Sequence, residues 1–270
     1  MEWVGEYAGM KVAVCVKQIP DPATPGRLDP TTNTLVRDGK LILDDSDAYG
    51  VEMGLQLVDA AGGGEVVLVS MAPHRETGGL RTALAMGADR AVLVSDDALA
   101  GSDALGTAKV LAAAIRPLGA DLVLAATEST DGYTGTTPVQ LAELLGLPSV
   151  TFAKRVELEG GGLRVRRQTE AGYDEVTCPL PALVTVTAGV VEPRYPSFKG
   201  IMGAKNKPVD VHTVADLGLD PAAAGWSGAR QVIVDVAPSE QRRAGEVVED
   251  QGDAHQAIIR FLEQIGRAHV

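Results

Sequence analysis

The sequence predicts an α/β fold: a parallel, doubly wound sheet with an antiparallel extension and a C-terminal arm. Apolar runs typical of strands buried on both faces alternate with helical patterns between residues 11 and 145. Residues 154–180 instead alternate polar and apolar side chains, which indicates antiparallel strands with one wet face. After residue 211 this order stops, so we expect residues 212–270 to form an arm that ends in a helix.

Short apolar runs are the predicted core strands, namely residues 11–17, 65–71, 90–94, 122–126 and 183–187. Helices are expected between them because apolar residues recur there at helical spacing. Asp44 or Asp45 is expected to cap the first helix, Gly87 to end the second and Asp103 to begin the third. This alternation predicts right-handed crossovers that place helices on both faces of the sheet.

Four further segments carry weaker patterns. Residues 34–43 are typical of a hairpin turned at an Asp-Gly pair, and residues 149–151 are expected to continue the edge of the sheet. Residues 232–236 form one more strand-like run. Residues 253–265 predict a final helix with one apolar side, which would cover either the body of the domain or a partner subunit.

Composition excludes several classes of protein. The 270 residues are 45% hydrophobic and 22% charged, which supports a substantial core and argues against global disorder. The net charge of −12 argues against nucleic-acid binding, and no apolar run reaches the roughly 18 residues that span a bilayer. Residues 1–9 are acidic and lack the basic start of a signal peptide, so we expect an N-terminal extension ahead of Met10.

Cysteine and histidine usage indicates a reducing compartment without a metal site. Cys15 and Cys178 both lie in apolar surroundings, so we expect inert core thiols and a cytoplasmic protein. The four histidines show no metal-ligand spacing.

A polar loop after the fourth strand is the first candidate site. Residues 128–138 are rich in Gly, Thr and Asp, and Leu141 belongs to the helical pattern that follows. Such a loop lies at the carboxyl end of a strand, where open α/β sheets bind ligands. Its glycines allow close backbone approach, and the amides of a new helix suit a phosphate. The alternative is an ordinary strand-to-helix loop capped by Thr136 or Thr137.

Residues 192–208 are the most specific stretch of the chain. They read EPRYPSFKGIMGAKNKP, which closely resembles the signature of the electron transfer flavoprotein β subunit. Four other segments are similar to the same family, namely residues 14–21, 81–89, 128–132 and 180–186. The resemblance runs from Met10 to about residue 265.

The resemblance implies a domain organisation. Residues 10–211 would form a Rossmann-like domain that binds an adenine nucleotide, with an antiparallel insertion at 154–180 and a recognition loop at 192–208. Residues 212–270 would form a C-terminal arm and helix packed on the partner subunit.

The resemblance also implies two nucleotides. The family forms a heterodimer with an α subunit that holds most of one FAD, while the β subunit buries an AMP with a structural role. Positions that match the AMP phosphate site are Asp131, Gly132, Gly135, Thr136 and Thr137. Positions that match the adenine and ribose site are Cys15, Asp44, Met71 and Ser129.

Several of these assignments leave alternatives open. Gly135 and Thr136 stand where better-known members have Asn or Gln, which leaves backbone amides and Thr hydroxyls to hold the phosphate. Plain core packing is an equal alternative for Cys15 and Met71. The isoalloxazine of FAD would lie near residues 20–22 and Ser46, although aromatic residues often found there in relatives are missing.

The family resemblance implies an electron carrier rather than an enzyme. Electrons would arrive from acyl-CoA dehydrogenases and similar flavin dehydrogenases of fatty acid oxidation, and leave toward the membrane-bound ETF-quinone oxidoreductase. Phe198 stands at the family's apolar anchor, usually Leu, and is expected to fill a pocket of the dehydrogenase unless it folds back onto the domain. Lys207 is expected to join nearby lysines against an acidic rim. The expected docking residues are Tyr195, Phe198, Lys199, Ile201, Met202 and Lys205.

Two other functions fit parts of the pattern. An electron-bifurcating member of the family would hold a second FAD in place of AMP and oxidise NADH, and the opening at residues 17–21 occurs in such members too. A free-standing nucleotide-binding module of the universal-stress type would share the strand and loop pattern, but would need neither the signature at 192–208 nor the arm.

Overall fold

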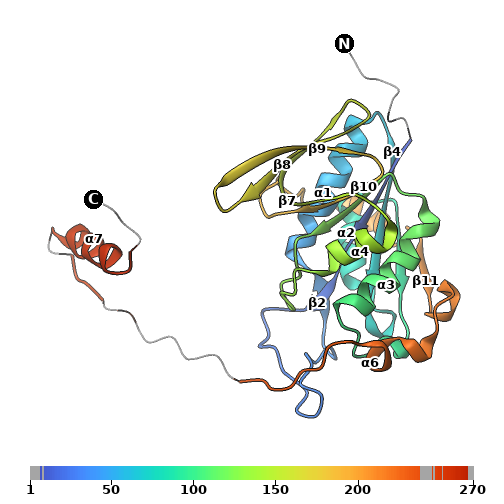
Figure 1. The fold of residues 1–270 in the computed structure, drawn as a ribbon, viewed down its shortest axis with the longest axis horizontal. Helices are drawn as coiled ribbons and strands as arrows, with labels where there is room; N and C mark the ends of the chain where they lie inside the picture. The colour runs from blue at the N-terminus through green and yellow to red at the C-terminus, as the bar shows by residue number, and fades with distance from the viewer. Residues whose placement is uncertain (1–6, 8, 238–244, 246, 251, 267–270) are drawn as a thin grey trace. The chain divides into compact units, whose positions relative to one another are not determined.

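One mixed sheet organises the structure, a computed structural model that describes residues 7, 9–237, 245, 247–250 and 252–266. Among these residues nine strands form the sheet in the order β11-β5-β4-β1-β6-β10-β7-β8-β9 (Figure 1). Their bounds are β1 (Met10–Cys15), β4 (Gly64–Met71), β5 (Arg90–Val94), β6 (Leu122–Ala126), β7 (Ser149–Glu159), β8 (Gly162–Thr169), β9 (Gly172–Pro179), β10 (Ala182–Val186) and β11 (Val209–His212). Neighbours from β11 to β7 run parallel, whereas β7, β8 and β9 run antiparallel. The predicted α/β class with an antiparallel extension is confirmed.

Helices cover both faces of the sheet. The helices α1 (Asp45–Ala60) and α2 (Gly78–Met86) pack on one face, and α3 (Ala104–Ile115) and α4 (Thr137–Leu145) on the other. Side chains of β1 alternate between the two faces of the sheet. Val12 and Val14 belong to the core on the side of α1 and α2, and Ala13 belongs to the core on the side of α3 and α4. All three side chains are fully buried, which explains why this strand is a continuous apolar run.

The strand order indicates where a ligand would bind. From β1 the chain proceeds outward to β4 and β5, and then returns to β6 on the other side of β1. The order therefore reverses between β1 and β6. In open α/β sheets, the carboxyl ends of the two strands at such a reversal form the edge of a binding crevice.

Several short elements lie outside the main layers. A two-stranded sheet joins β2 (Gln18–Pro20) and β3 (Leu41–Leu43). The helices α5 (Phe198–Ala204) and α6 (Gly225–Gly228) follow later in the chain. Single 3-10 turns cover Pro73–Arg75, Asp97–Leu99, Arg116–Leu118, Ala215–Leu217 and Pro221–Ala223.

Two strand predictions are wrong. Residues 34–43 do not fold on themselves as a hairpin, because β3 pairs antiparallel with β2, a partner that lies earlier in the chain. Residues 149–151 do not form an edge, since β7 lies between β10 and β8 and continues through Glu159. β3 pairs with β2 and β7 pairs with β10 across long intervening segments, so local pattern carries no signal for either pairing.

The chain divides into two units, residues 1–233 and 234–270, which are described separately. Residues 212–230, the beginning of the expected arm at 212–270, lie in the first unit. Val214 is fully buried there, and the backbone amide of Arg230 donates to Asp103 Oδ2 at 2.7 Å. Residues 232–236 adopt no strand.

The second unit contains α7 (Ala254–Gln264), which confirms the predicted final helix. Ile258 and Phe261 are exposed within this unit, so α7 presents an apolar side. The predicted extension at 1–9 lies largely outside the described residues. No helix within the described part of the chain is long and apolar enough to cross a membrane.

Replacing Gly101 by Ala should destabilise the first unit. Gly101 has a φ of +80°, and a Cβ there would overlap the indole of Trp226. We expect a loss of about 2–4 kcal/mol in the free energy of unfolding, from strain and overpacking together. The matched control is Gly119→Ala, because Gly119 has a φ of +58° with nothing within 4 Å of the added Cβ. Urea denaturation should show the smaller loss of about 1 kcal/mol for the control; equal losses would mean that Trp226 does not pack there.

Candidate functional site

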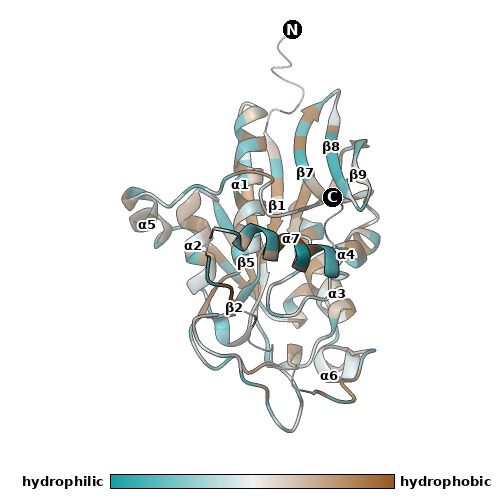
Figure 2. Cartoon of the chain, turned by 90° about the vertical axis from the view of Figure 1, so that its left-hand side faces the viewer, coloured by the Kyte–Doolittle hydropathy of each residue, from teal (hydrophilic) through white to brown (hydrophobic). Residues whose placement is uncertain are grey.

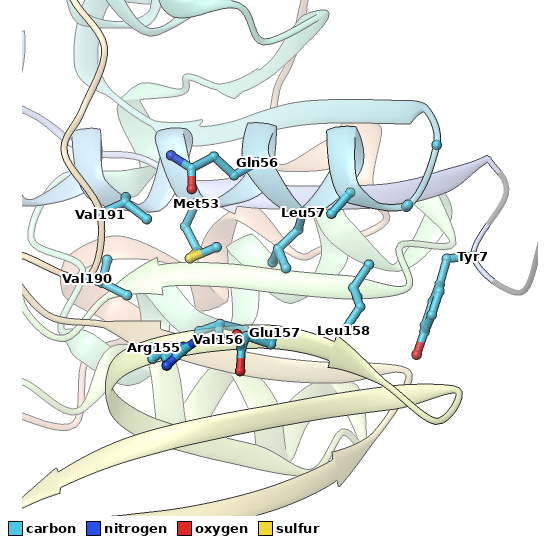
Figure 3. Close-up of a pocket in the computed structure, with 13 residues that line it drawn as sticks. Tyr7, Met53, Gln56, Leu57, Arg155, Val156, Glu157, Leu158, Val190 and Val191 are labelled. Atoms are coloured by element: carbon cyan, nitrogen blue, oxygen red, sulfur yellow. Dashed lines mark hydrogen bonds and ion pairs between the residues drawn. The ribbon is translucent and has the colours of Figure 1, made fainter. Parts of the chain in front are cut away.

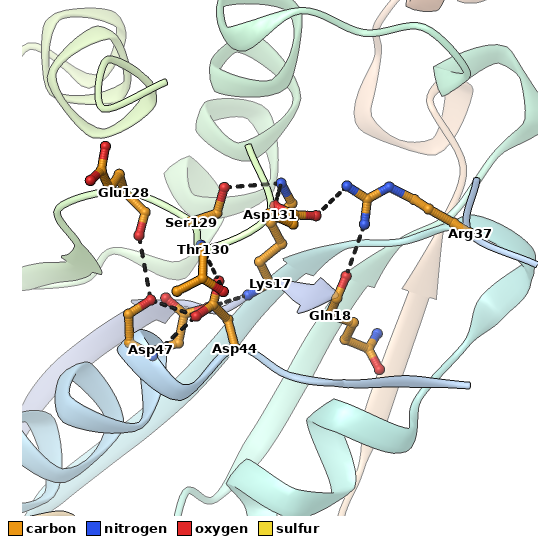
Figure 4. A network of polar contacts seen from close by, with 10 residues as sticks. Lys17, Gln18, Arg37, Asp44, Asp47, Glu128, Ser129, Thr130 and Asp131 are labelled. Carbon is orange, nitrogen blue, oxygen red and sulfur yellow. Dashed lines mark hydrogen bonds and ion pairs between the residues drawn. The ribbon is translucent and has the colours of Figure 1, made fainter. Parts of the chain in front are cut away.

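A polar cluster lies at the carboxyl ends of β1 and β6, where the strand order reverses (Figure 4). Lys17 comes from the turn after β1, and Ser129, Thr130 and Asp131 come from the loop after β6. The start of α1 contributes Asp44 and Asp47, and Arg37 comes from the long excursion between β2 and β3. Segments far apart in sequence thus meet at one edge of the sheet.

Asp44 joins the start of α1 to the loop after β6. Its side chain is fully buried and accepts four hydrogen bonds. Oδ1 accepts from the amide and hydroxyl of Ser46 at 3.0 and 2.7 Å, which makes Asp44 the N-cap of α1 as predicted. Oδ2 accepts from the amide and hydroxyl of Thr130 at 2.7 and 3.1 Å. All the acceptor capacity of this carboxylate is used within the protein, so it braces the loop.

Asp131 lies between two cations. Lys17 Nζ is 2.6 Å from Asp131 Oδ1 and also donates to Ser129 Oγ at 3.1 Å, while Arg37 Nη2 donates to Asp131 Oδ2. The carboxylate side chain is only 6% exposed, against 39% for Lys17 and 28% for Arg37. A ligand that approaches from solvent therefore meets the two cations before the carboxylate.

Asp47 closes the cluster from the first turn of α1. It is buried, and its Oδ2 accepts from the backbone amide of Lys17 at 2.6 Å. The amide of Asp44 in turn donates to the carbonyl of Lys17 at 3.0 Å. These two bonds fix the backbone of the turn after β1, and with it the direction of the Lys17 side chain.

The two aspartates of the cluster have opposite pKa shifts. Burial raises the pKa of Asp47 well above its usual value, and the charges of Asp44 and Asp131 add to this. Burial acts in the same direction on Asp131, but the charges and hydrogen bonds of Lys17 and Arg37 outweigh it and hold the pKa of Asp131 below its usual value. Burial also raises the pKa of the Cys15 thiol to about 12, which keeps this cysteine protonated.

The structure brings together some of the predicted nucleotide residues and spaces others along the same edge. Asp44, Ser129 and Asp131 are linked through the cluster. Cys15 and Met71 end β1 and β4, so they lie at the same edge of the sheet. Gly132 follows Asp131, and a Cβ there would lie 3.2 Å from Ser129 Oγ.

The loop ends at the start of α4. Gly135 has a φ of +64°, a conformation that favours glycine. Thr136 is the N-cap residue by position, but its side chain makes no capping hydrogen bond, and Thr137 is the first residue of the helix. The alternative of a loop capped by a Thr hydroxyl therefore fails in this structure, and the first amides of α4 are not taken by Thr136.

Sequence reasoning missed the two cations of the cluster. A lysine directly after an apolar strand was a usable signal for Lys17, because the carboxyl end of a core strand is where a ligand binds. No local signal exists for Arg37, since the excursion that carries it reaches the loop only through tertiary structure. The cysteines are free thiols in the described residues, as expected.

A cavity in the described residues lies away from this cluster. It has a volume of about 620 Å³ and separates α1 from β7 (Figure 3). Met53, Leu57 and Val156 line it, together with the polar Gln56 and Glu157. None of the predicted site residues lines this cavity, so its size does not bear on the predicted nucleotide site.

Part of the signature segment, Phe198–Ala204, forms the helix α5. Ser197 caps α5 by accepting from the amide of Gly200 at 3.0 Å, and Phe198 is the first helical residue. Phe198 is 81% exposed, so it does not fold back onto the domain. The other predicted docking residues are also exposed, namely Tyr195, Lys199, Ile201, Met202 and Lys205.

Lys207 does not take part in an outward basic cluster. Its Nζ donates to the carbonyls of Leu84, Gly87 and Ala88 at 3.0, 3.1 and 2.6 Å. The ammonium group therefore points into the protein, and the expectation that it faces a partner is wrong.

Arg194 ties the segment before α5 to α1. Its guanidinium binds Glu52 in a bidentate manner, with Nε to Oε2 at 2.6 Å and Nη2 to Oε1 at 3.1 Å. Burial of Glu52 would raise its pKa, but the Arg194 hydrogen bonds outweigh this and lower it. This ion pair fixes the entry to the exposed helix.

Comparison with known proteins identifies the family of this chain. Residues 32–217 match the family described as "Electron transfer flavoprotein domain". The "Electron transfer flavoprotein subunit beta" of Mycobacterium tuberculosis is 38% identical over 257 residues, which are 93% of this chain and 97% of that protein. The protein of the same name from Thermoanaerobacterium thermosaccharolyticum is 37% identical over 263 residues, 97% and 100% of the two chains.

The chain belongs to the electron transfer flavoprotein β-subunit family. The family match includes the loop after β6, the signature segment and β11, and the relatives extend it over nearly the whole chain. A further relative is the "Caffeyl-CoA reductase-Etf complex subunit CarD" of Acetobacterium woodii, 36% identical over 241 residues, 88% of this chain and 92% of that protein. Membership in this family removes the alternative of a free-standing universal-stress-type module.

Replacing Asp47 by Asn should stabilise the protein at neutral pH. Because the folded-state pKa of Asp47 is raised, the folded protein binds more protons than the unfolded chain, and stability falls as the pH rises from about 4 toward the folded-state pKa. Asn removes this titration and still accepts from the Lys17 amide. We expect a higher free energy of unfolding at pH 7 than in the wild type, and a difference that shrinks as the pH falls toward about 4.

Urea denaturation across a pH series measures this effect, and Asp131→Asn is the matched comparison. The lowered pKa of Asp131 means that its stabilisation is present above about pH 4 and is lost as the pH falls, so this variant should be less stable at pH 7 and equal to the wild type in acid. An Asp47→Asn variant that loses stability at pH 7 would contradict the assignment.

Proposed function

We propose that this protein is the β subunit of a heterodimeric electron transfer flavoprotein and acts as an electron carrier rather than an enzyme. The observation that carries this proposal is the family match over nearly the full length of the β-subunit relatives. In this function it pairs with an α subunit and completes the site of a shared FAD, which supplies the one- and two-electron chemistry. The region around residues 20–22 and Ser46 faces that FAD, and the complex works in the cytoplasm.

The proposed structural nucleotide is AMP at the crevice between β1 and β6. Several features of this chain fit a phosphate there. Lys17 and Arg37 place positive charge outside the buried Asp131, and the first amides of α4 are not taken by Thr136. Two buried oxygens near this edge, Ser70 Oγ and Gln140 Oε1, lack a hydrogen-bond partner among the described residues, as is typical of a polar ligand site.

The residues that would hold AMP are those that end the strands and open α4. Asp131, Gly132, Gly135, Thr136 and Thr137 surround the phosphate in this proposal. Cys15, Met71 and Ser129 line the adenine and ribose. Asp44 contributes mainly by holding the loop in place, because its carboxylate is already fully hydrogen-bonded.

The proposed docking surface is the exposed face of α5. Phe198 anchors it, with Tyr195, Ile201 and Met202 around it and Lys199 and Lys205 at its rim. An exposed aromatic on a short helix suits a pocket on a partner, and the lysines suit an acidic rim. Electrons pass from acyl-CoA dehydrogenases and similar flavin dehydrogenases to the shared FAD, and then to ETF-quinone oxidoreductase at the membrane.

The second candidate is an electron-bifurcating β subunit, in which a second FAD replaces AMP and NADH is oxidised. The similarity to the Acetobacterium woodii subunit of a caffeyl-CoA reductase-Etf complex favours keeping this alternative. The two candidates differ in the nucleotide that the β subunit holds.

Nucleotide content distinguishes the two candidates. Denaturing the purified heterodimer should release one FAD and one AMP per heterodimer, measured by chromatography and absorbance. A Lys17→Gln, Arg37→Gln double variant should lose AMP but keep its FAD, because only the β-subunit site contains these cations. Two FAD molecules per heterodimer would instead establish the bifurcating type.

Replacing Phe198 by Ala should weaken docking. Removing an exposed aromatic anchor should raise the KM of a donor dehydrogenase for this carrier about tenfold or more, with kcat and nucleotide content unchanged. The matched control is Tyr173→Ala, since Tyr173 is an exposed aromatic on β9, outside the proposed docking surface. An unchanged KM for Phe198→Ala would remove the docking role of α5.

A further inference from the structure

Taken alone, the helix α5 would not form a rigid docking element. It has seven residues, two of which are Gly200 and Gly203. Isolated helices much shorter than about 12 residues do not form in water, and each glycine lowers helix propensity further. The neighbours of α5 must therefore hold its conformation.

A reciprocal pair of cations joins α5 to α2. Arg81, on α2, donates from Nη1 to the carbonyls of Ala204 and Lys207 at 2.7 Å each, at the carboxyl end of α5. Lys207, just after α5, donates from Nζ to three carbonyls at the carboxyl end of α2, those of Leu84, Gly87 and Ala88. The last carbonyls of a helix lack partners within the helix and carry partial negative charge, so a cation placed there stabilises it.

Close packing completes the attachment. A Cβ at Gly200 would lie 2.5 Å from the carbonyl oxygen of Ala85, so only glycine lets α5 approach α2 this closely. Figure 2 shows α5 beside α2, with apolar residues on α5. The helix α2 is itself fixed at its start, where the amide of Gly79 donates to the buried Gln18 Oε1 at 2.8 Å. The docking helix therefore rests on a rigid support.

We propose that Arg81 and Lys207 are positioning residues for docking: by reciprocal capping of α2 and α5 they hold α5 preformed, so that Phe198 is presented without an ordering step. This inference rests on the proposed docking function of α5. Neither residue touches the partner, because both direct their charged groups to backbone carbonyls. A preordered element binds more tightly because its conformational entropy is already lost before association.

The test compares Arg81→Gln and Lys207→Gln in the purified heterodimer. Loss of charge-assisted hydrogen bonds to two or three carbonyls should raise the KM of a donor dehydrogenase about five- to tenfold, with kcat and the rate of dithionite reduction of FAD unchanged. Amide hydrogen exchange in α5 should accelerate in both variants. The matched charge control is Lys109→Gln, since Lys109 is exposed on α3 across the sheet, and it should change neither quantity.

The outcomes separate this inference from the proposed function. If Phe198→Ala raises KM and Arg81→Gln does not, the positioning role is overturned and docking by α5 stands. If Phe198→Ala itself leaves KM unchanged, the docking function fails first. Should both glutamine variants fail to fold, hydrogen exchange on the wild type decides: protected α5 amides support the proposal, and amides that exchange at the rate of an unstructured segment overturn it.

Discussion

The carboxylate of Asp44 is the contact on which the candidate site depends. Its four hydrogen bonds join the start of α1 to the loop after β6, and its backbone amide fixes the turn after β1. These segments meet where the sheet order reverses, so one buried side chain sets the geometry of the whole edge. Burial makes each of these bonds expensive to leave unmade, which restricts the residue types that this position tolerates.

The charged side chains of the polar cluster and of the region around α5 fall into two groups: those directed into the protein and those that face solvent. Asp44, Asp47, Arg81 and Lys207 are directed at protein groups and determine shape. Other charged groups, such as Lys199 and Lys205 in the signature segment, remain exposed. Lys17 and Arg37 are intermediate, because each pairs with Asp131 and remains partly exposed. In the signature segment, residue type alone therefore does not indicate whether a lysine directs its ammonium group into the protein or to solvent.

Sequence reasoning predicted the parts of this protein that local pattern specifies. Strands such as residues 122–126 are continuous apolar runs because both faces are covered, and the cap at Asp44 follows from residue type at a helix start. Pairings that depend on distant partners were missed: β3 pairs with β2, and Arg37 reaches Asp131 across a long excursion. The helix in the signature segment was missed because its glycine-rich sequence has low propensity, and tertiary capping overrides that preference.

The sheet is open, so β11 and β9 each have one edge without a neighbouring strand in the described part of the chain. β11 is only four residues long and follows Pro208, whereas β9 carries Asp174 and Glu175 and ends at Pro179. Short length, charge and proline are the features by which native sheets discourage strand addition. At β11 a second copy of the chain could form only a few backbone hydrogen bonds, and at β9 it would meet charged side chains. Both edges of the sheet therefore disfavour polymerisation by strand addition.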